Sequence, residues 1–248
     1  MYEQIASLTP LLIPAFIVLD LLHSQRRYDR PRFWRLRALA TTAGIVVFTT
    51  WVAGLWGTLF GGFSLIDGSG LGIIGGAIIG VVVYEFIHYW YHRAAHEWDW
   101  LWRLHQMHHS AESLDAFGAN YIHPLDAALF TTWGSLVFFP LLGLRVEAGI
   151  LATLFVTFNA MFQHANIRTP RWLGYLIQRP ESHVVHHARG VHRRNYSDFP
   201  LWDALFGTFE NPKAVDGVEL GFYKGASSRV IEMLAGRDVT TPRITGNA

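Results

Sequence analysis

The sequence has no cysteine among its 248 residues, and only 16% of the residues are charged. Without cysteine, the chain has no thiolate ligand for a haem and no cysteine ligands for an iron–sulfur cluster. The formal net charge at pH 7 is only +1, and the basic residues do not form a stripe along one face. The composition therefore gives no indication of a nucleic-acid-binding surface.

The low charge is matched by a high apolar content. Hydrophobic residues make up 51% of the chain, and the mean hydropathy is positive. Apolar runs recur near the length of about 20 residues that a helix needs to cross a bilayer. The clearest runs are 38–60, 70–87, 125–144 and 147–163. The first run along the chain, 8–22, is shorter and contains Pro14 and Asp20, so it is either a short or tilted span or an interfacial helix. The sequence predicts an all-α integral membrane protein with four or five transmembrane helices.

The arginines predict an orientation. Residues 23–37 contain six arginines, whereas residues 61–70 contain neither lysine nor arginine. Because cytoplasmic loops carry an excess of positive charge, the first segment is expected in the cytoplasm and the second outside. Counting spans onward places every later histidine-rich segment on the cytoplasmic side. We therefore expect a cytoplasmic cap of short helices, formed by residues 88–122 and 165–248.

Eight of the thirteen histidines form three short clusters. The clusters are HxxxH (His92, His96), HxxHH (His105, His108, His109) and HxxHH (His183, His186, His187). Residues at i, i+3 and i+4 share one face of a helix, and neutral imidazole is the commonest protein ligand for transition metals. The clusters offer more nitrogens than one ion accepts, which predicts two metal ions a few ångströms apart. An unbroken helix would put His96 and His105 on opposite faces, so the residues between them are expected to bend or break.

The remaining histidines are single. His88 continues the stripe of His92 and His96 one turn deeper into the third apolar run, beside Glu85. His123 precedes Pro124 at the start of the fourth run, and whether it is a ligand is left open. His164 ends the fifth run and is interpreted as a ligand or as a residue that supports one. His192 lies among arginines and is interpreted as part of a solvated basic surface, and His23 is interpreted as structural.

Three segments carry a family resemblance: EFIHYWYHRAAH, LWRLHQMHHSAE and SHVVHHARGVHRRNYSDFPLWDALFGTFE. Together they resemble the fatty acid hydroxylase and sterol desaturase superfamily of integral-membrane non-haem di-iron oxygenases. The resemblance covers about residues 80–210. It is strongest to bacterial sterol desaturase-like members and to the alkylglycerol monooxygenase branch, because of HHSAE and LWDALFGTFE. Family members often have aspartate where this chain has Glu85.

This resemblance implies a ligand set and a chemistry. The ligands would be the eight cluster histidines, and His88, His123 and His164 match less constant positions. The resemblance implies two iron ions, which zinc can replace in purified samples. It also implies O2, a sterol, fatty acyl or ether lipid substrate, and a separate electron donor such as a cytochrome, ferredoxin or reductase. Hydroxylation, desaturation and ether cleavage share such a centre, so the residues leave the reaction open.

A histidine-rich membrane zinc hydrolase or metal transporter is the alternative, because ligand type alone does not choose iron over zinc. The zincin pattern is incomplete, since the segment beginning at His96 lacks a second histidine at i+4. We expect residues 1–248 to form a single membrane domain, with N-terminal spans within 8–60 and a polar tail over 212–248. The expected location is a bacterial inner membrane, crossed several times, with membrane lipids around it and the metal site on the cytoplasmic side.

Overall fold

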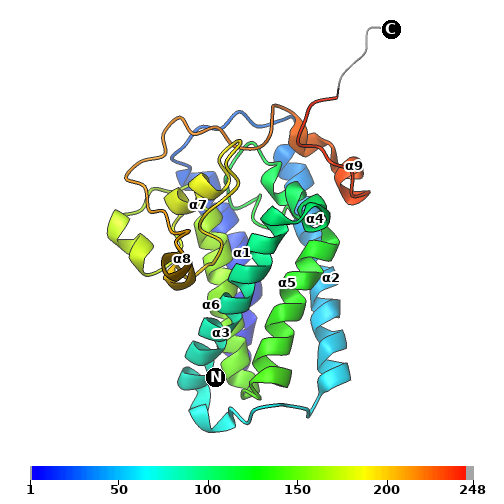
Figure 1. Cartoon of the computed structure of the whole chain (residues 1–248), viewed down its shortest axis with the longest axis vertical. Helices are drawn as coiled ribbons and strands as arrows, with labels where there is room; N and C mark the ends of the chain where they lie inside the picture. The colour runs from blue at the N-terminus through cyan, green and yellow to red at the C-terminus, as the bar shows by residue number, and fades with distance from the viewer. Residues whose placement is uncertain (1, 244–248) are drawn as a thin grey trace.

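Five long helices lie side by side in the computed structural model, which describes residues 2–243 (Figure 1). They are α1 (Tyr2–His23), α2 (Trp34–Phe60), α3 (Gly72–Glu97), α5 (Pro124–Leu136) and α6 (Val146–His164). Within the described residues no β-strand occurs beyond an isolated bridge between Ala188 and Leu220. The predicted all-α class is confirmed. These five helices are called the bundle below.

Three segments of the bundle are long and apolar enough to cross a membrane, counting only residues that the structure describes. They are Trp34–Phe60, Ser69–Glu97 and Val146–His164. They coincide with the predicted runs 38–60, 70–87 and 147–163, because long apolar stretches are stable in lipid only as helices that satisfy their own backbone. The apolar part of α1, Leu8–His23, is shorter, although α1 packs against α6 (Figure 1).

The predicted run 125–144 is not one continuous α-helix. Its regular part is α5, which ends at Leu136 and continues into a π-helical turn, Val137–Leu141. Pro140 lies inside this turn. Proline lacks an N–H group, and its ring clashes with the carbonyl of the residue four positions earlier, here Leu136. The regular helix therefore ends where Pro140 requires it to end.

The bundle has a definite order of neighbours. α6 packs against both α1 and α3, and α5 packs against both α2 and α3. Small residues on α3 permit the close approach: a Cβ at Gly80 would lie 2.8 Å from Leu144, and one at Gly76 would lie 3.0 Å from Ala148. Small residues at helix contacts are typical of packing within membranes.

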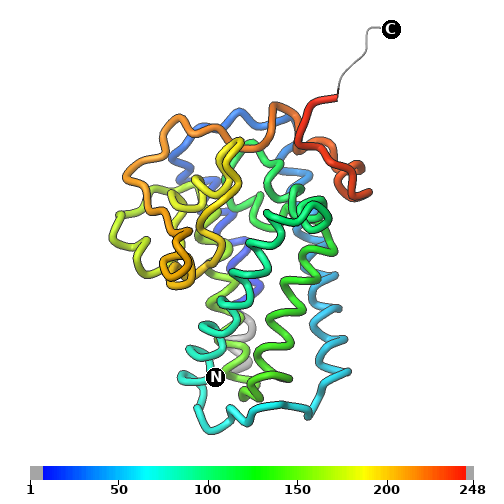
Figure 2. Tube along the Cα trace, in the orientation of Figure 1, coloured from blue at the N-terminus to red at the C-terminus, as the bar shows by residue number. Residues whose placement is uncertain are grey.

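A cap covers one end of the bundle, and is defined here as residues 98–123 and 165–243. It contains α4 (Asp99–His109), α7 (Pro180–His186), α8 (Leu201–Phe206) and α9 (Val230–Leu234). The connection between α1 and α2 lies at the same end, whereas the connection between α2 and α3 lies at the opposite end (Figures 1 and 2). The predicted cap began at residue 88, but residues 88–97 belong to α3, which is regular as far as Glu97.

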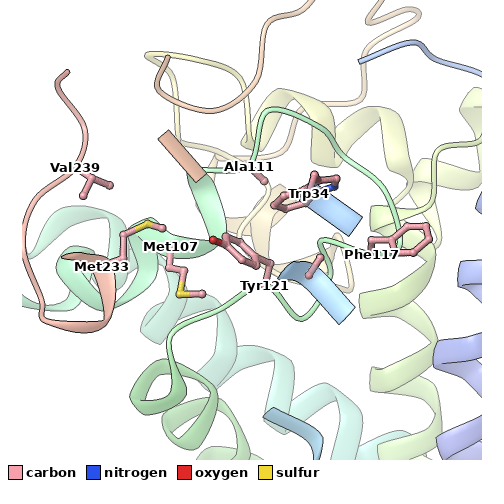
Figure 3. Packing of buried hydrophobic residues seen from close by; sticks show 8 residues of the cluster. Trp34, Met107, Ala111, Phe117, Tyr121, Met233 and Val239 are labelled. Atoms are coloured by element: carbon pink, nitrogen blue, oxygen red, sulfur yellow. The ribbon is translucent and has the colours of Figure 1, made fainter. Parts of the chain in front are cut away.

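A hydrophobic cluster joins the cap to the bundle (Figure 3). Trp34 at the start of α2 packs edge-on against Tyr121, with ring centroids 4.9 Å apart. Met107 of α4 and Met233 of α9 belong to the same buried cluster. The C-terminal tail is therefore attached to the cap by buried side chains, although its sequence is largely polar.

The arginine-rich connection between α1 and α2 is more than a solvated loop. Arg26 forms a buried ion pair with Glu181 of α7 at 2.6 Å, and Arg30 binds Asp115 at 2.9 Å. Buried or part-buried pairs of this kind are costly to break, because the remaining charge loses its partner. The loop thus fastens the cap to the first two helices.

Candidate metal centre

The first two histidine clusters meet because the chain breaks between them. α3 ends at Glu97, Trp98 is extended (φ −107°, ψ 119°), and α4 begins at Asp99. The predicted break between His96 and His105 is confirmed. It turns α4 back so that rings from both clusters come within 4.9 Å of one another, measured between the His96 and His105 centroids.

The structure sorts nine histidines into two groups. The first histidine group is His92, His96, His105, His109 and His186, and the second is His108, His164, His183 and His187. Within each group, one nitrogen from every ring lies within 4.8 Å of the others. All eight cluster histidines are thus brought together, and His164 joins them. Whether each one ligates a metal is taken up under the proposed function.

Each of the two HxxHH clusters contributes histidines to both groups. On α4, His105 and His109 point to the first group, and His108 points to the second. On α7 the assignment is reversed, because His183 and the following His187 belong to the second group and His186 to the first. In both clusters the i, i+4 pair shares a group, while the residue at i+3 is directed to the other. The groups adjoin closely: the His109 and His187 rings stack with centroids 4.2 Å apart.

Hydrogen bonds fix the rings of the first group with their Nε2 lone pairs directed inward. His92 Nδ1 donates to the Tyr196 carbonyl at 2.6 Å, and His105 Nδ1 donates to Asp126 Oδ2 at 2.7 Å. A neutral imidazole protonated at Nδ1 has only a lone pair at Nε2. Yet the His92 and His105 Nε2 atoms lie 3.0 Å apart. Two lone pairs at this distance repel unless a cation lies between them.

His186 completes this pattern. Its Nδ1 donates to the Arg194 carbonyl at 2.7 Å, and its buried Nε2 has no protein partner. Buried polar atoms are nearly always satisfied, so a buried orphan lone pair indicates an absent partner such as an ion.

The second group shows the same arrangement. His164 Nδ1 donates to the Ala160 carbonyl at 2.7 Å, which leaves one lone pair on Nε2. The Nε2 atoms of His108 and His183 both approach it, at 3.1 and 3.0 Å. His187 Nε2 lies a further 3.1 Å from His183 Nε2. Ligands about 2.1 Å from one metal and at right angles are about 3.0 Å apart, so these spacings fit a shared ion.

Electrostatics keeps the cap histidines in the form that binds metals. Burial, reinforced by neighbouring imidazoles, lowers the pKa of His109 and His187 well below the usual value for histidine. Burial likewise lowers the pKa of His183 and His186 well below that value. Neutral imidazole carries the lone pair that a metal ion requires. The donor set therefore fits borderline metals such as iron or zinc.

A second layer of side chains holds the histidine rings in place. Asp126 accepts from His105 Nδ1 and, through its other oxygen, from the Tyr91 hydroxyl at 2.5 Å. Asp203 accepts from the Tyr196 and Ser197 backbone N–H groups, both at 2.8 Å, and so fixes the loop whose carbonyl orients His92. Such carboxylate and carbonyl partners set the tautomer and direction of ligating histidines.

The other histidines have different positions. His88 lies outside both groups, in a third group with Glu85 and Asp198. His123 also lies outside: its Nδ1 accepts from Leu125 N at 3.1 Å, and its Nε2 lies 3.3 Å from the Leu234 carbonyl. His23 is exposed at the end of α1. The interpretation of His192 as a solvated surface residue is wrong, because its Nδ1 lies 3.1 Å from His109 Nδ1 and burial lowers its pKa to about 4.

Sequence reasoning missed Asp126, Asp203 and the Tyr196 carbonyl. Asp126 lies in the first turn of α5, two residues after Pro124, so its position beside the cap could have been inferred from the sequence. Asp203 belongs to the LWDALFGT segment, which carries part of the family resemblance but does not by itself indicate a role for this aspartate. A backbone carbonyl such as that of Tyr196 leaves no signature in a sequence.

A cavity of about 1090 Å³ leads from the centre into the bundle. Its wall at the cap end includes His92, His105 and His108, and its far end is lined by Gly61–Ser64 and Phe139. Side chains between the two ends are mainly apolar, among them Ile45, Phe130 and Val156. Ligand pockets are usually about 300–1,000 Å³, so this space suits a large apolar molecule.

Comparisons with known proteins identify a family and several similar proteins. The family model described as fatty acid hydroxylase matches residues 77–208, just over half of the chain. Similar proteins include alkylglycerol monooxygenase of Homo sapiens (34% identity, 57% of this chain and 32% of the relative). Ornithine lipid hydroxylase OlsE of Rhizobium tropici (28% identity, 64% and 49%) and sphinganine C4-monooxygenase 1 of Arabidopsis thaliana (27% identity, 53% and 53%) are further examples. The matched region thus spans about a third to a half of these relatives. No solved structure matches significantly.

Proposed function

Because the chain belongs to the fatty acid hydroxylase family, we propose that it is an O2-dependent non-haem di-iron oxidoreductase that hydroxylates or desaturates a membrane lipid. The observation that carries the proposal is the pair of adjoining histidine groups with inward Nε2 atoms. Each group supplies four or five imidazoles at spacings that fit one ion, and the two groups share α4 and α7.

The proposed ligands are the eight cluster histidines together with His164. Two iron ions in such a site supply the reduction of dioxygen and the removal of hydrogen from an unactivated C–H bond. The protein contributes the placement. Asp126 and the Tyr196 carbonyl hold the protons of His105 and His92 on Nδ1, so that Nε2 stays free for the metal.

The cavity gives the proposal its substrate class. Its apolar length fits a hydrocarbon chain, and its histidine end brings one part of that chain to the centre. The names of the relatives refer to alkylglycerol, ornithine lipid and sphinganine. We propose a sterol, fatty acyl or ether lipid taken from the surrounding membrane, with electrons from a separate cytochrome, ferredoxin or reductase.

Ligand substitutions test the proposal. His186→Ala removes a nitrogen from the first group and His108→Ala removes one from the second. Each should abolish oxygen- and reductant-dependent conversion of membrane lipids, because the reaction needs both ions. The protein should remain in the membrane, since helix packing holds the bundle. Lipid products are followed by mass spectrometry at matched protein levels.

His23→Ala is the matched control, because His23 is exposed and lies outside both groups. It should leave conversion unchanged. Unchanged turnover in both ligand variants, or turnover that persists without oxygen, would exclude the oxygenase and favour a zinc hydrolase or metal transporter. Metal analysis of the wild type should find two ions in the histidine groups, with iron active even where zinc co-purifies.

A further inference from the structure

A third cluster of potential ligands lies one turn below the first histidine group. Glu85 and His88 come from α3, and Asp198 comes from the loop after α7. Their exposed fractions are 0%, 7% and 4%, so all three are withdrawn from solvent. The cluster lies beside the cavity, whose wall includes His88 and Asp198.

The cluster contains two carboxylates, and Asp198 Oδ1 also accepts from Gln163 Nε2 at 2.6 Å. Among the described residues, His88 is the only basic side chain within 4.0 Å of either carboxylate. When both carboxylates are ionised, one imidazolium leaves an excess negative charge, and buried charges are costly unless they are paired or coordinate a metal. A divalent cation beside a neutral His88 would balance both carboxylates.

Two buried polar atoms of the cluster have no hydrogen-bond partner among the described residues. His88 Nδ1 has no hydrogen-bond partner, and it lies 3.8 Å from Glu85 Oε2 and 4.0 Å from Asp198 Oδ2. Glu85 Oε1 is also buried without a partner. These separations are too long for direct hydrogen bonds. Two ligands about 2.1 Å from a shared ion lie up to about 4.2 Å apart, so an ion between them fits.

We propose that Glu85, His88 and Asp198 bind a third divalent metal ion, distinct from those of the two histidine groups. Two carboxylates and one imidazole suit Mn²⁺ or Fe²⁺, since carboxylates favour manganese and imidazole favours iron and zinc. The proposal does not depend on the oxygenase reaction.

The third ion has a structural consequence for the centre. Glu85 Oε2 already accepts from Asp198 N at 2.9 Å, and an ion would add a bond between α3 and the same loop. Two residues earlier in that loop, the Tyr196 carbonyl orients His92. The ion would therefore hold the loop against α3 and steady the ring of His92.

Counting metal ions tests this site. The full chain in lipid nanodiscs is stripped with a chelator, saturated with Fe²⁺ in the absence of oxygen, freed of unbound ion, and analysed by mass spectrometry for iron per chain. We expect three ions in the wild type and two in Glu85→Gln and in Asp198→Asn. Asp20→Asn is the matched control: Asp20 is 1% exposed, accepts from the Ala116 and Asn166 backbone N–H groups, and should keep three ions.

Two results would overturn the proposal. A saturated wild type with two ions would show that the cluster holds only water, and a third ion that persists in both carboxylate variants would be adventitious. His88→Gln keeps both carboxylates and reports the same loss if either carboxylate variant does not fold. A failure of the proposed function gives a different result: no lipid conversion would be found, but the count would still be three metal ions per chain.

Discussion

Replacing Asp126 by asparagine isolates the effect of the groups that orient the ligands. Asp126 is fully buried and accepts from His105 Nδ1 at 2.7 Å and from the Tyr91 hydroxyl at 2.5 Å. Asparagine has the same shape but presents an N–H donor as well as an oxygen. If the amide N–H is directed at His105, the ring must place its own proton on Nε2, which removes the lone pair that faces His92.

The magnitude follows from known effects of such partners. Loss of a residue that supports a metal-ligating histidine typically lowers metal affinity about 10–100-fold, or about 1.4–2.7 kcal/mol. Tyr91→Phe leaves the carboxylate in place and removes only the donor behind it. The loss of metal-binding free energy should be smaller in this variant, about 0.5–1.5 kcal/mol, which is the contribution of one ordinary hydrogen bond.

Competition with a chelator of known affinity measures this change for each ion. Asp126→Asn should weaken the binding of the ion in the first histidine group more than the binding of the ion in the second. Asp20→Asn is the control, because its partners are backbone N–H groups and no histidine. Unchanged affinity of both ions in Asp126→Asn would refute the reasoning that the His105 tautomer is set by this carboxylate.

Three further predictions address topology, cavity and pH. A reporter fused after residue 115 should behave as cytoplasmic and one inserted near Asp67 as external, and finding both on one side would overturn the orientation. Gly134→Leu should fill the cavity beside Tyr84 and lower lipid conversion without changing metal content, whereas Gly44→Leu, with no atom within 4 Å of its added Cβ, should not. Burial lowers the pKa of His183 and His186 in the folded protein. Below about pH 6.5, the ordinary pKa of histidine, the unfolded chain therefore binds more protons than the folded one. Metal-free protein should therefore lose thermal stability as pH falls through that value, and a flat profile would contradict the neutral buried state.

The long helices could be predicted because their cause is local. In α2, α3 and α6, an apolar run near spanning length is sufficient to define the element. The same holds for the break at Trp98, since a separation of nine positions from His96 to His105 does not allow both clusters on one face of one helix. The end of α5 could also have been predicted, because Pro140 is present in the sequence. Hydropathy alone, however, predicts a run that continues past this proline to residue 144.

The partition of the histidines could not be predicted, because it depends on tertiary placement. Spacing places His105, His108 and His109 on neighbouring positions of a helix and says nothing of which nitrogen meets which partner. His123 and His164 are alike in sequence as single histidines at the cap ends of apolar runs. The structure separates them: the His164 ring points between α4 and α7, whereas His123 caps α5.

Each HxxHH cluster contributes histidines to both groups, and this links the two groups through α4 and α7. An HxxxH pair can serve only one group, as His92 and His96 do. The additional histidine of each HxxHH cluster lets one helix contribute to both groups, so α4 and α7 each contact both proposed ions. A displacement of either helix would change both coordination sets together. Metal binding at the two groups should therefore be coupled. Once one ion has ordered α4 and α7, the second ion should bind more tightly than the first ion binds to the metal-free chain.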